Sequence, residues 1–471
     1  MGSFGAGGRS VVPLLAFLGV MAYSLPMAVM TPALPALQAE MGTSAAGAAW
    51  SVTGMVLSAS VATPVAGRLG DLLGARRVLL WVLAVGIAGQ VVSALANGLP
   101  VLLAGRVLAG VGSGVFPLAY TIIRKGHPAE RAASAIGLMS AMLGLGGVVS
   151  WVIAGPVIDH LGWRWLVWVP AVILLPGTFL ARRALPPVPG EPGKGVDWWG
   201  ALLFGGWLTA ALTALTQGSS WGWTSAPVLG LLAGAAAGAA VWAYVEATVP
   251  DPLLDLRLMR LRGVWTANLG SLLAGFCLMA SGVLFPLLIQ MPEKDGFGFG
   301  GTATDTAMVA LPASVAMTLM GLVNGRLDRR FGARAVLAAG AALTAAGYGV
   351  LVLWHAELWQ LLLTNVLRGA GLGMAYAAVA TLVVSAVPVS QTGVATGVNT
   401  LLRTVGAGLG TQLTAILVAA YALARPGFVL AFAVCGALAL AILAVALLAP
   451  RRPAVPDEPR AEQPDGPPAA F

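Results

Sequence analysis

The chain has 471 residues, of which 58% are hydrophobic and only 9% are charged, and its mean hydropathy is +0.88. Because soluble domains carry about 25% charged residues, this composition excludes a soluble enzyme or binding domain. It predicts an all-α polytopic protein embedded in a lipid bilayer. The net charge of +8 comes from basic residues in short loops, which is typical of membrane topology and not of a nucleic-acid partner. We expect no cofactor and no metal, because the sequence lacks a phosphate-binding P-loop and paired Cys or His motifs.

Fourteen apolar segments come close to the length of about 20 residues that a helix needs to cross a bilayer. The predicted spans form groups of six, two and six, at residues 11–33, 47–68, 78–97, 100–122, 134–158, 165–182, 199–217, 226–246, 264–290, 304–325, 335–354, 358–386, 394–418 and 428–449. We therefore predict an N-terminal six-helix bundle, a linker with two inserted spans, a C-terminal six-helix bundle and a disordered cytoplasmic tail, at residues 1–184, 185–257, 258–450 and 451–471.

Lys and Arg in the loops predict the orientation of the spans. If the N-terminus is cytoplasmic, the inner loops and span ends hold twenty basic residues, and the outer loops hold only Arg164, Lys294 and Arg425. Basic residues concentrate on the cytoplasmic side of membrane proteins. The distribution therefore places both termini in the cytoplasm and supports an even number of spans.

A charged turn repeats at matching points of the two six-span groups. Gly67–Arg77 follows the second span, and Gly325–Arg334 lies 258 residues further along the chain. Arg106–Gly114 in span 4 aligns with Asn365–Gly373 in span 12 at an offset of 259, and a third match joins the fifth span of each half at an offset of 260. Matches in register on three helices predict two homologous halves, an architecture typical of alternating-access transporters.

The first turn has the pattern G-x-L-x-D-x-x-G-x-R-R, which resembles the signature loop of the major facilitator superfamily. Arg106-x-x-x-Gly110-x-Gly112 resembles the second motif of that superfamily. The layout of six, two and six spans is similar to that of the fourteen-span drug:proton antiporters. The resemblance implies a major facilitator fold with two pseudo-symmetric bundles and two inserted helices. It also implies efflux of a small-molecule drug, antibiotic or metabolite, with proton coupling, by a monomer in a bacterial plasma membrane.

Two departures from the antiporter pattern leave the coupling open. Pro26 stands in span 1 where the antiporters carry an acid, and Ser150-Trp151 replaces the Gly-Pro dipeptide of span 5. In addition, none of the predicted spans carries a carboxylate near its middle. An uptake symporter or facilitator for an anionic solute is therefore an alternative within transport. A polytopic membrane protein without transport activity is a second alternative, although no cluster of catalytic polar residues is visible.

Several in-span polar residues are candidates for a central cavity, because ionisable groups at membrane depth are usually functional. The resemblance places Arg106 in the cavity, in coupling or in contact with an anionic substrate; the alternative is a structural bond to backbone carbonyl groups. Asn399 and Arg403 share one helical face of span 13 with Gly406 and Gly410. Asn365 lies one turn before a further arginine in span 12 and is expected to face the same pathway.

Soft and aromatic residues complete the predicted cavity. Tyr23, Met27 and Met30 recur at helical spacing in span 1, as do Phe276 and Met279 in span 9. Such surfaces adapt to varied ligands, although ordinary packing of the helices is the alternative explanation.

The first charged turn is the candidate cytoplasmic gate, formed by Gly67, Asp71, Gly74, Arg76 and Arg77. We expect Asp71 to pair with arginines and with the N-terminus of a facing helix, which would stabilise the conformation closed to the cytoplasm. The alternative is that the basic residues only fix the topology. When the two turns are aligned on their last glycines, an acid stands at the position of Asp71 only in the first half, so the predicted gate is one-sided.

Overall fold

The computed structural model describes residues 8–43, 45–127, 129–190, 197–249, 254, 256–293, 297–355, 357–421 and 424–450. The predicted tail at 451–471 and part of the predicted linker lie outside these residues. The first half comprises α1 (Gly8–Gly19), the π-helical turn η1 (Val20–Ser24), α2 (Leu25–Ala28), α3 (Met30–Met41), α4 (Ala45–Leu73), α5 (Ala75–Ala94), α6 (Leu99–Gly110), the 3-10 turn η2 (Val111–Gly114), α7 (Val115–Gly126), α8 (Ala129–Leu161) and α9 (Arg164–Ala184). The remainder comprises α10 (Trp198–Trp221), α11 (Ala226–Thr248), α12 (Leu256–Met259), α13 (Arg262–Gln290), α14 (Ala303–Phe331), α15 (Ala333–Leu353), α16 (Leu358–Ala386), the 3-10 turn η3 (Val389–Gln391), α17 (Thr392–Ala420) and α18 (Arg425–Leu448).

The all-helical fold confirms the predicted fold class. Among the described residues, twelve helices are long and apolar enough to cross a membrane, and α10 adds a shorter apolar segment at Trp199–Leu215. The count of fourteen spans therefore stays a prediction. The first span is irregular: it passes through the π-helical turn η1 directly before Pro26, since a proline cannot donate to the helical hydrogen-bond ladder.

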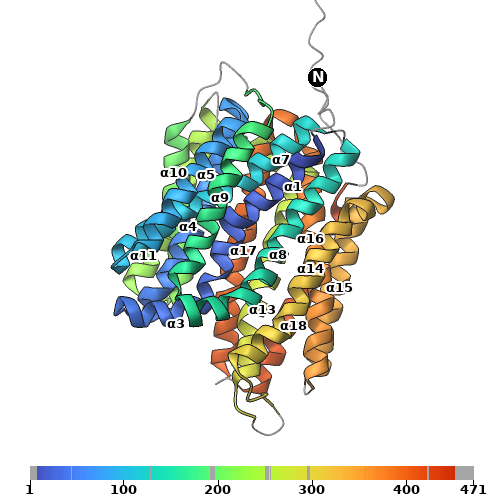
Figure 1. Ribbon diagram of the computed structural model, residues 1–471. Coiled ribbons are helices and arrows are strands. Elements are labelled where there is room, and N and C mark those ends of the chain that lie inside the picture. Colours follow the sequence, from blue (N-terminus) through green and yellow to red (C-terminus); the bar gives the residue numbers. More distant parts are fainter. Residues whose placement is uncertain are drawn as a thin grey trace, which may run out of the picture.

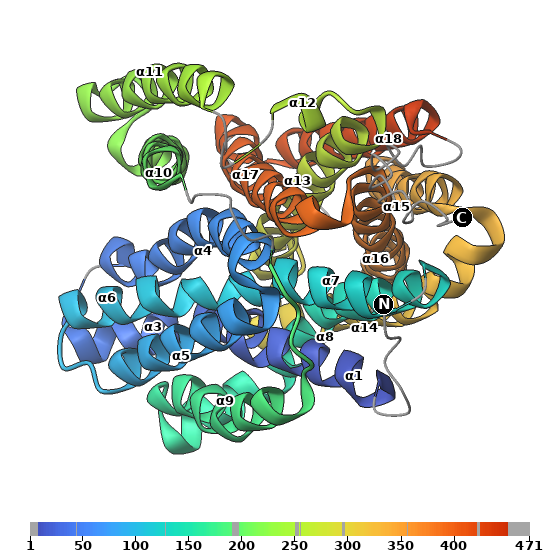
Figure 2. The same ribbon diagram turned by 90° about the horizontal axis from the view of Figure 1, so that it is seen from above.

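Each half of the chain builds its own apolar core. One cluster of buried side chains runs from Val11 to Val188 and also takes in Ala380 and Val384 of α16, and a second runs from Val264 to Ala449. Figures 1 and 2 show the corresponding helices as two groups that stand side by side. The exact limits of the four regions stay a prediction, but the separation of the cores fits two duplicated bundles.

The inserted helices α10 and α11 lie outside the bundles, beside α4 and α17 (Figure 2). Phe204 and Trp207 of α10 pack on Trp242 of α11, with ring centroids 5.4 and 5.9 Å apart. Leu212 of α10 joins a small apolar cluster with Leu57 of α4 and residues of α17. The inserted pair therefore spans the seam between the halves on this side.

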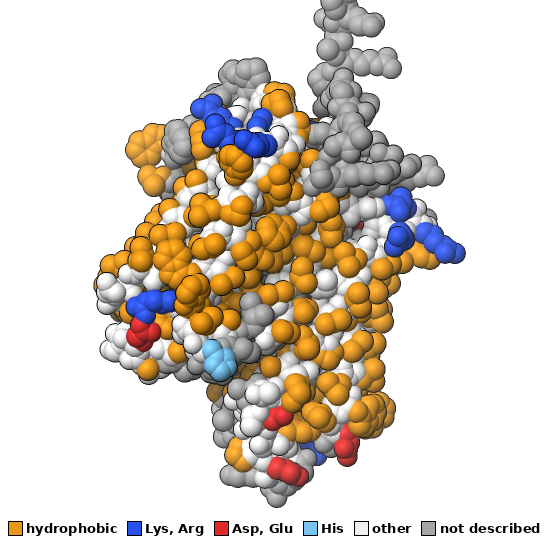
Figure 3. Space-filling view, in the orientation of Figure 1, with side chains coloured by type: hydrophobic (Ala, Val, Ile, Leu, Met, Phe, Trp, Pro, Cys, Tyr) orange, Lys and Arg blue, Asp and Glu red, His pale blue; other side chains and the backbone are white. Residues whose placement is uncertain are grey.

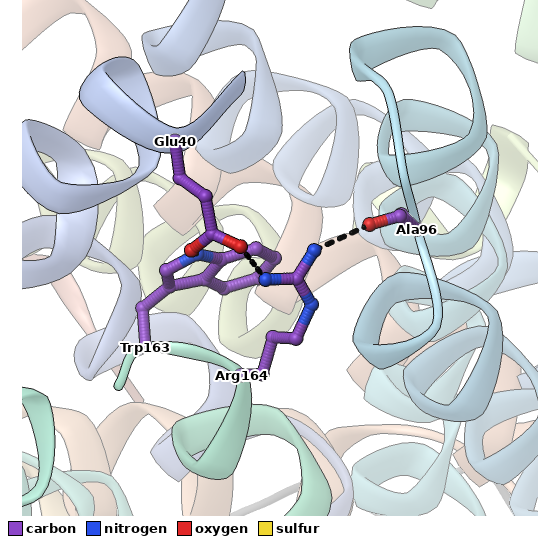
Figure 4. Close-up of polar contacts among 4 residues, drawn as sticks. All are labelled: Glu40, Ala96, Trp163 and Arg164. Carbon is purple, nitrogen blue, oxygen red and sulfur yellow. Dashed lines mark hydrogen bonds and ion pairs between the residues drawn. The ribbon is translucent and has the colours of Figure 1, made fainter. Parts of the chain in front are cut away.

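A charged cluster ties three connections of the first half together (Figure 4). Glu40, near the end of α3, accepts a hydrogen bond of 2.6 Å from the indole nitrogen of Trp163 and forms an ion pair with Arg164. Arg164 also donates to the carbonyl oxygen of Ala96 over 2.9 Å. These contacts fix the first half at the end opposite to the turns at Gly74 and Gly332. We call the end with those turns the hairpin end and the opposite end the far end.

The outer surface is apolar along the helices and charged at its two ends. In Figure 3 the Lys and Arg side chains in view gather mainly toward the hairpin end, whereas the acidic side chains lie toward the far end.

Candidate functional site: a cavity between the two halves

At the hairpin end, α4 of the first half meets α17 of the second half with almost no side chain between them. A carbon atom added to Gly67 would lie 2.3 Å from the carbonyl oxygen of Gly393, and one added to Gly393 would lie 2.5 Å from the carbonyl oxygen of Gly67. Contacts of 3.0 Å or less are too short for any side chain, so only glycine fits at either position. The small residues let the backbones touch.

The second contact between the halves has the same design. Gly325 of α14 packs against the backbone of Ser134 of α8, where an added carbon atom would lie 2.3 Å from the Cα atom of Ser134. A carbon atom added to Gly137 of α8 would lie 2.8 Å from the carbonyl oxygen of Gly321. The turns that follow α4 and α14 both use a glycine with positive φ, Gly74 at 98° and Gly332 at 81°. The structure thus repeats at the two positions where the charged turn repeats in the sequence.

Asp71 bonds the first half to the second. Its carboxylate is 1% exposed and accepts hydrogen bonds from the backbone nitrogens of Gly393, at 3.3 Å, and Val394, at 3.2 Å. These groups belong to the first turn of α17, where the unpaired N–H groups and the helix dipole attract a negative charge. Thr121 of α7 donates to the same carboxylate over 3.5 Å. The predicted contact of Asp71 with a facing helix N-terminus is present.

Arg124 forms a second bridge between the halves, one that the sequence analysis did not single out. From the last turn of α7 its guanidinium donates to the hydroxyl group of Thr392 over 2.7 Å and to the carbonyl oxygen of Val387 over 2.7 Å. A cation at the carboxyl end of α16 is favourable for the helix dipole. The basic last turn of α7 was the available signal, but in the sequence it also serves the topology.

The predicted arginines of the gate do not take part. Arg76 donates to the carbonyl oxygen of Arg182 within the first half, and Arg77 stacks on Trp81, with its guanidinium carbon 4.9 Å from the ring centroid. Neither touches Asp71, because both project from the start of α5 and not from α4. Arg76 and Arg77 are therefore not partners of Asp71 in this conformation, whereas Arg68 of the same turn lies close enough to interact with its charge.

The second half holds a counterpart of Asp71 that the alignment placed one residue out of register. Asp328 of α14 accepts from Thr381 of α16 over 3.1 Å and from Asn324 over 2.9 Å. The bond to Thr381 matches the bond between Asp71 and Thr121. Its Oδ1 atom is buried and has no hydrogen-bond partner among the described residues. Among the described residues Asp328 has no bond to the first half, so the one-sided gate stays a prediction.

Between the halves, on the far-end side of these contacts, lies a cavity of about 550 Å³. Its wall comes from both halves and from α10, which contributes Leu212 and Leu215. The lining is mainly apolar, with hydroxyl groups such as those of Ser60, Thr400 and Thr404. A central, mostly apolar cavity with a few polar groups is the usual form of a site for a small molecule. A second hollow, of about 590 Å³ between α15 and α18, is lined only by Ala, Gly, Val and Leu and offers no group to orient a solute.

Four of the nine predicted cavity residues line this space: Tyr23 and Met27 from the first half, and Met279 and Arg403 from the second half. Among the described residues of the lining Arg403 alone is charged, and its guanidinium carbon lies 5.2 Å from the ring centroid of Tyr376. In the described part of the chain it forms no ion pair.

Arg106 lies outside the cavity. It is fully buried in the first half, where it donates to the carbonyl oxygens of Ser51 and Pro26, both at 3.0 Å. The prediction that Arg106 lines the cavity is wrong for this conformation, since the side chain satisfies backbone carbonyls of neighbouring helices.

The other four predicted cavity residues are also packed inside their own half. Asn399 joins α17 to α13 through bonds to Ala267 and Asn268, and Asn365 accepts from Arg368 over 2.8 Å. Met30 and Phe276 belong to the two apolar cores. The polar face of span 13 is split: Asn399 faces α13, while Arg403 and its neighbours face the cavity.

Comparisons of the sequence and of the fold with known proteins point to one superfamily. The sequence profile described as Major Facilitator Superfamily matches residues 16–311 and 268–470. The solved structure of the human organic anion transporter MFSD10 (TETRAN) superposes with a TM-score of 0.66 at 16% identity, over 94% of this chain and 100% of the other. At that identity the likeness shows the fold alone.

Curated relatives of this chain include two export proteins and an uncharacterized transporter. The cephamycin export protein CmcT of Amycolatopsis lactamdurans is 33% identical over 81% of this chain and 79% of its own length. The tetracenomycin C resistance and export protein of Streptomyces glaucescens is 28% identical over 88% and 77%. An uncharacterized MFS-type transporter of Mycobacterium tuberculosis is 30% identical over 86% of this chain, which spans only 58% of that relative's length. The chain, with its two helical bundles around a central cavity, therefore belongs to the major facilitator superfamily.

Proposed function

We propose that this protein is a secondary transporter, and not an enzyme, that exports a small amphipathic compound by alternating access. The observation that supports this most is the cavity of about 550 Å³ between the halves, which is closed at the hairpin end by contacts made between the halves. Relatives named as export proteins for cephamycin and tetracenomycin C favour efflux of a drug, antibiotic or metabolite.

The contacts at the hairpin end suit a reversible closure. Hydrogen bonds to a charged group contribute roughly 1.5–3 kcal/mol each, and Asp71 accepts two from the N-terminus of α17. When the halves rock apart, water can replace these donors, so the net difference between the two states is small. The glycine contacts fix where the halves meet, and Asp71 stabilises the closed arrangement.

We propose a location in a bacterial plasma membrane, as a monomer with both termini in the cytoplasm. The basic residues in the loops near the hairpin end support this orientation. The hairpin end is then cytoplasmic, and the conformation described above is the one that faces outward, in which a substrate leaves the cavity.

We propose protons as the driving ions, with Asp328 as a coupling group. Among the described residues of the two halves, the buried carboxylates are those of Asp71 and Asp328. Asp71 is held by backbone donors, whereas Asp328 has one oxygen without a partner and forms no ion pair in the described part of the chain. A buried carboxylate without a cation is costly in its charged form and binds a proton readily.

The cation in the cavity lining favours a second candidate, uptake or facilitated passage of an anionic solute. The same cavity could serve either direction of transport. The direction of flux against an imposed gradient separates the two.

The first prediction concerns energised transport. Purified protein in liposomes is expected to move an aromatic antibiotic against its gradient when the liposomes carry a pH gradient in the antiport sense. Counterflow exchange without a gradient is expected to continue. Flux that is independent of the pH gradient would contradict antiport, and flux that follows the proton gradient inward would support the uptake alternative.

The second prediction concerns Asp71. Asn keeps one acceptor oxygen but turns an amide group toward a backbone N–H donor, so Asp71→Asn should favour opening of the hairpin end by roughly tenfold. Ala380, which is 7% exposed and packs against the first-half core, can report this opening as Ala380→Cys, because the native Cys277 and Cys435 are buried. The labelling rate with a maleimide should rise in Asp71→Asn and stay unchanged in the control Asp305→Asn, which alters an exposed acid at the far end of α14. Equal rates in all three proteins would reject the proposed role.

The third prediction concerns Asp328. Asp328→Asn should lose concentrative transport driven by a pH gradient while it retains counterflow, because exchange of substrate needs no net proton movement. Asp305→Asn, on the same helix, serves again as the control and should keep both activities. If Asp328→Asn still concentrates substrate in response to the pH gradient, the coupling group lies elsewhere.

A further inference from the structure

Arg403 differs from the other two arginines that the sequence places inside the spans. Arg106 donates to two backbone carbonyl oxygens, and Arg368 donates to Asn365 and lies over Phe285, its guanidinium carbon 5.5 Å from the ring centroid. Both are buried within one half. Arg403 is only partly buried and faces the space between the halves.

The surroundings of Arg403 do not neutralise its charge. The described residues that line the cavity include no Asp, Glu, Lys or His, and in the same part of the chain Arg403 forms no ion pair. Its stacking on Tyr376 contributes about 0.5–2 kcal/mol. A charged side chain near the centre of a membrane span costs about 2.5–3.5 kcal/mol on insertion scales, so the stacking alone does not compensate the cost.

The groups beside Arg403 are suited to a ligand with a single anionic end. Thr400 and Thr404 follow the same face of α17 and present hydroxyl groups to the cavity. A guanidinium group binds a carboxylate through two parallel N–H donors. The hydroxyl group of Thr400 can donate to one of the remaining lone pairs, whereas that of Thr404 already donates to the carbonyl oxygen of Thr400 over 3.1 Å. The described part of the lining offers no second cation to hold a second anionic group.

The rest of the cavity is suited to an apolar body. Met27, Met279 and Met317 lie in the lining with the rings of Tyr23 and Phe116. Thioether and aromatic side chains adapt to flat apolar molecules of different outline. A highly charged or sugar-like solute would leave this wall without suitable partners.

We propose that the transported compounds are amphipathic monoanions, with a carboxylate or a similar group bound by Arg403 and an apolar ring system held by the methionine and aromatic wall. This inference rests on the proposed function, because it takes the compounds that bind in the cavity to be the compounds that are exported. The binding preference itself can be measured without transport.

The test uses three compounds of the same shape: 1-naphthoate, 1-naphthamide and 1-naphthylmethylammonium. Isothermal titration of the purified protein should give a Kd for the anion at least about tenfold lower than for the neutral amide, with the cation weakest. Arg403→Gln should abolish this preference but bind the amide as well as the wild type does, which shows that the cavity is intact. Arg403→Lys should keep a weaker preference, because an ammonium group lacks the paired donors.

Arg183→Gln is the matched control. Arg183 also lies over an aromatic ring, with its guanidinium carbon 4.3 Å from the centroid of Phe179, but it is exposed at the end of α9, away from the cavity. It should bind all three compounds like the wild type. Sodium sulfate, which has the charge without the apolar body, should not displace the naphthoate at equal concentration.

Equal affinity of the wild type for the three compounds, or an unchanged preference in Arg403→Gln, would overturn the proposal, as would displacement by sulfate. The proposal would also be overturned if none of the three compounds bound to the wild-type protein. Failure of the proposed export function would give a different result. The titration would still show the preference for naphthoate, but the liposome assay would show no flux.

Discussion

The contact between Gly67 and Gly393 is the constraint on which the arrangement of the two halves depends. Because neither residue has a side chain, the backbones of α4 and α17 touch at the hairpin end. That approach brings the start of α17 within reach of Asp71, whose carboxylate then accepts from two backbone N–H groups. The same design at Gly325 and Ser134 closes the opposite side of the seam. The halves are held together there, on the hairpin-end side of the cavity.

The three in-span arginines show how a membrane protein distributes costly charge. Arg106 and Arg368 are surrounded by carbonyl, amide and aromatic groups of their own half, and they stabilise the packing of each bundle. Arg403 lies where the halves face each other. Its position makes its electrostatic environment depend on what fills the cavity, so a bound anion would be part of the energetics of the site.

The sequence predicted the fold well because the repeated turn depends on local chemistry. A glycine at the position of Gly74 and Gly332 permits the positive φ of each turn, and the spacing of the repeats follows from the duplication. The cavity was predicted less well. A polar residue in a span can face either the cavity or a neighbouring helix, and the sequence of one helix does not distinguish the two. Asn399 and Arg403 are one turn apart, yet one bonds α13 and the other lines the cavity. Asp328 does not align with Asp71 when the turns are aligned on Gly74 and Gly332, yet its carboxylate accepts from Thr381 as that of Asp71 accepts from Thr121.

The central claim is that the hairpin end and the far end open in alternation. Double electron–electron resonance can measure both ends with spin labels on exposed residues: Leu73 and Phe331 at the hairpin end, 40% and 58% exposed, and Leu95 and Leu353 at the far end, 61% and 64% exposed. As a transported compound is titrated in, the population with a long Leu73–Phe331 distance should grow together with the population that has a short Leu95–Leu353 distance. Distances that lengthen or shorten together at both ends, or that do not respond to the compound at all, would contradict alternating access.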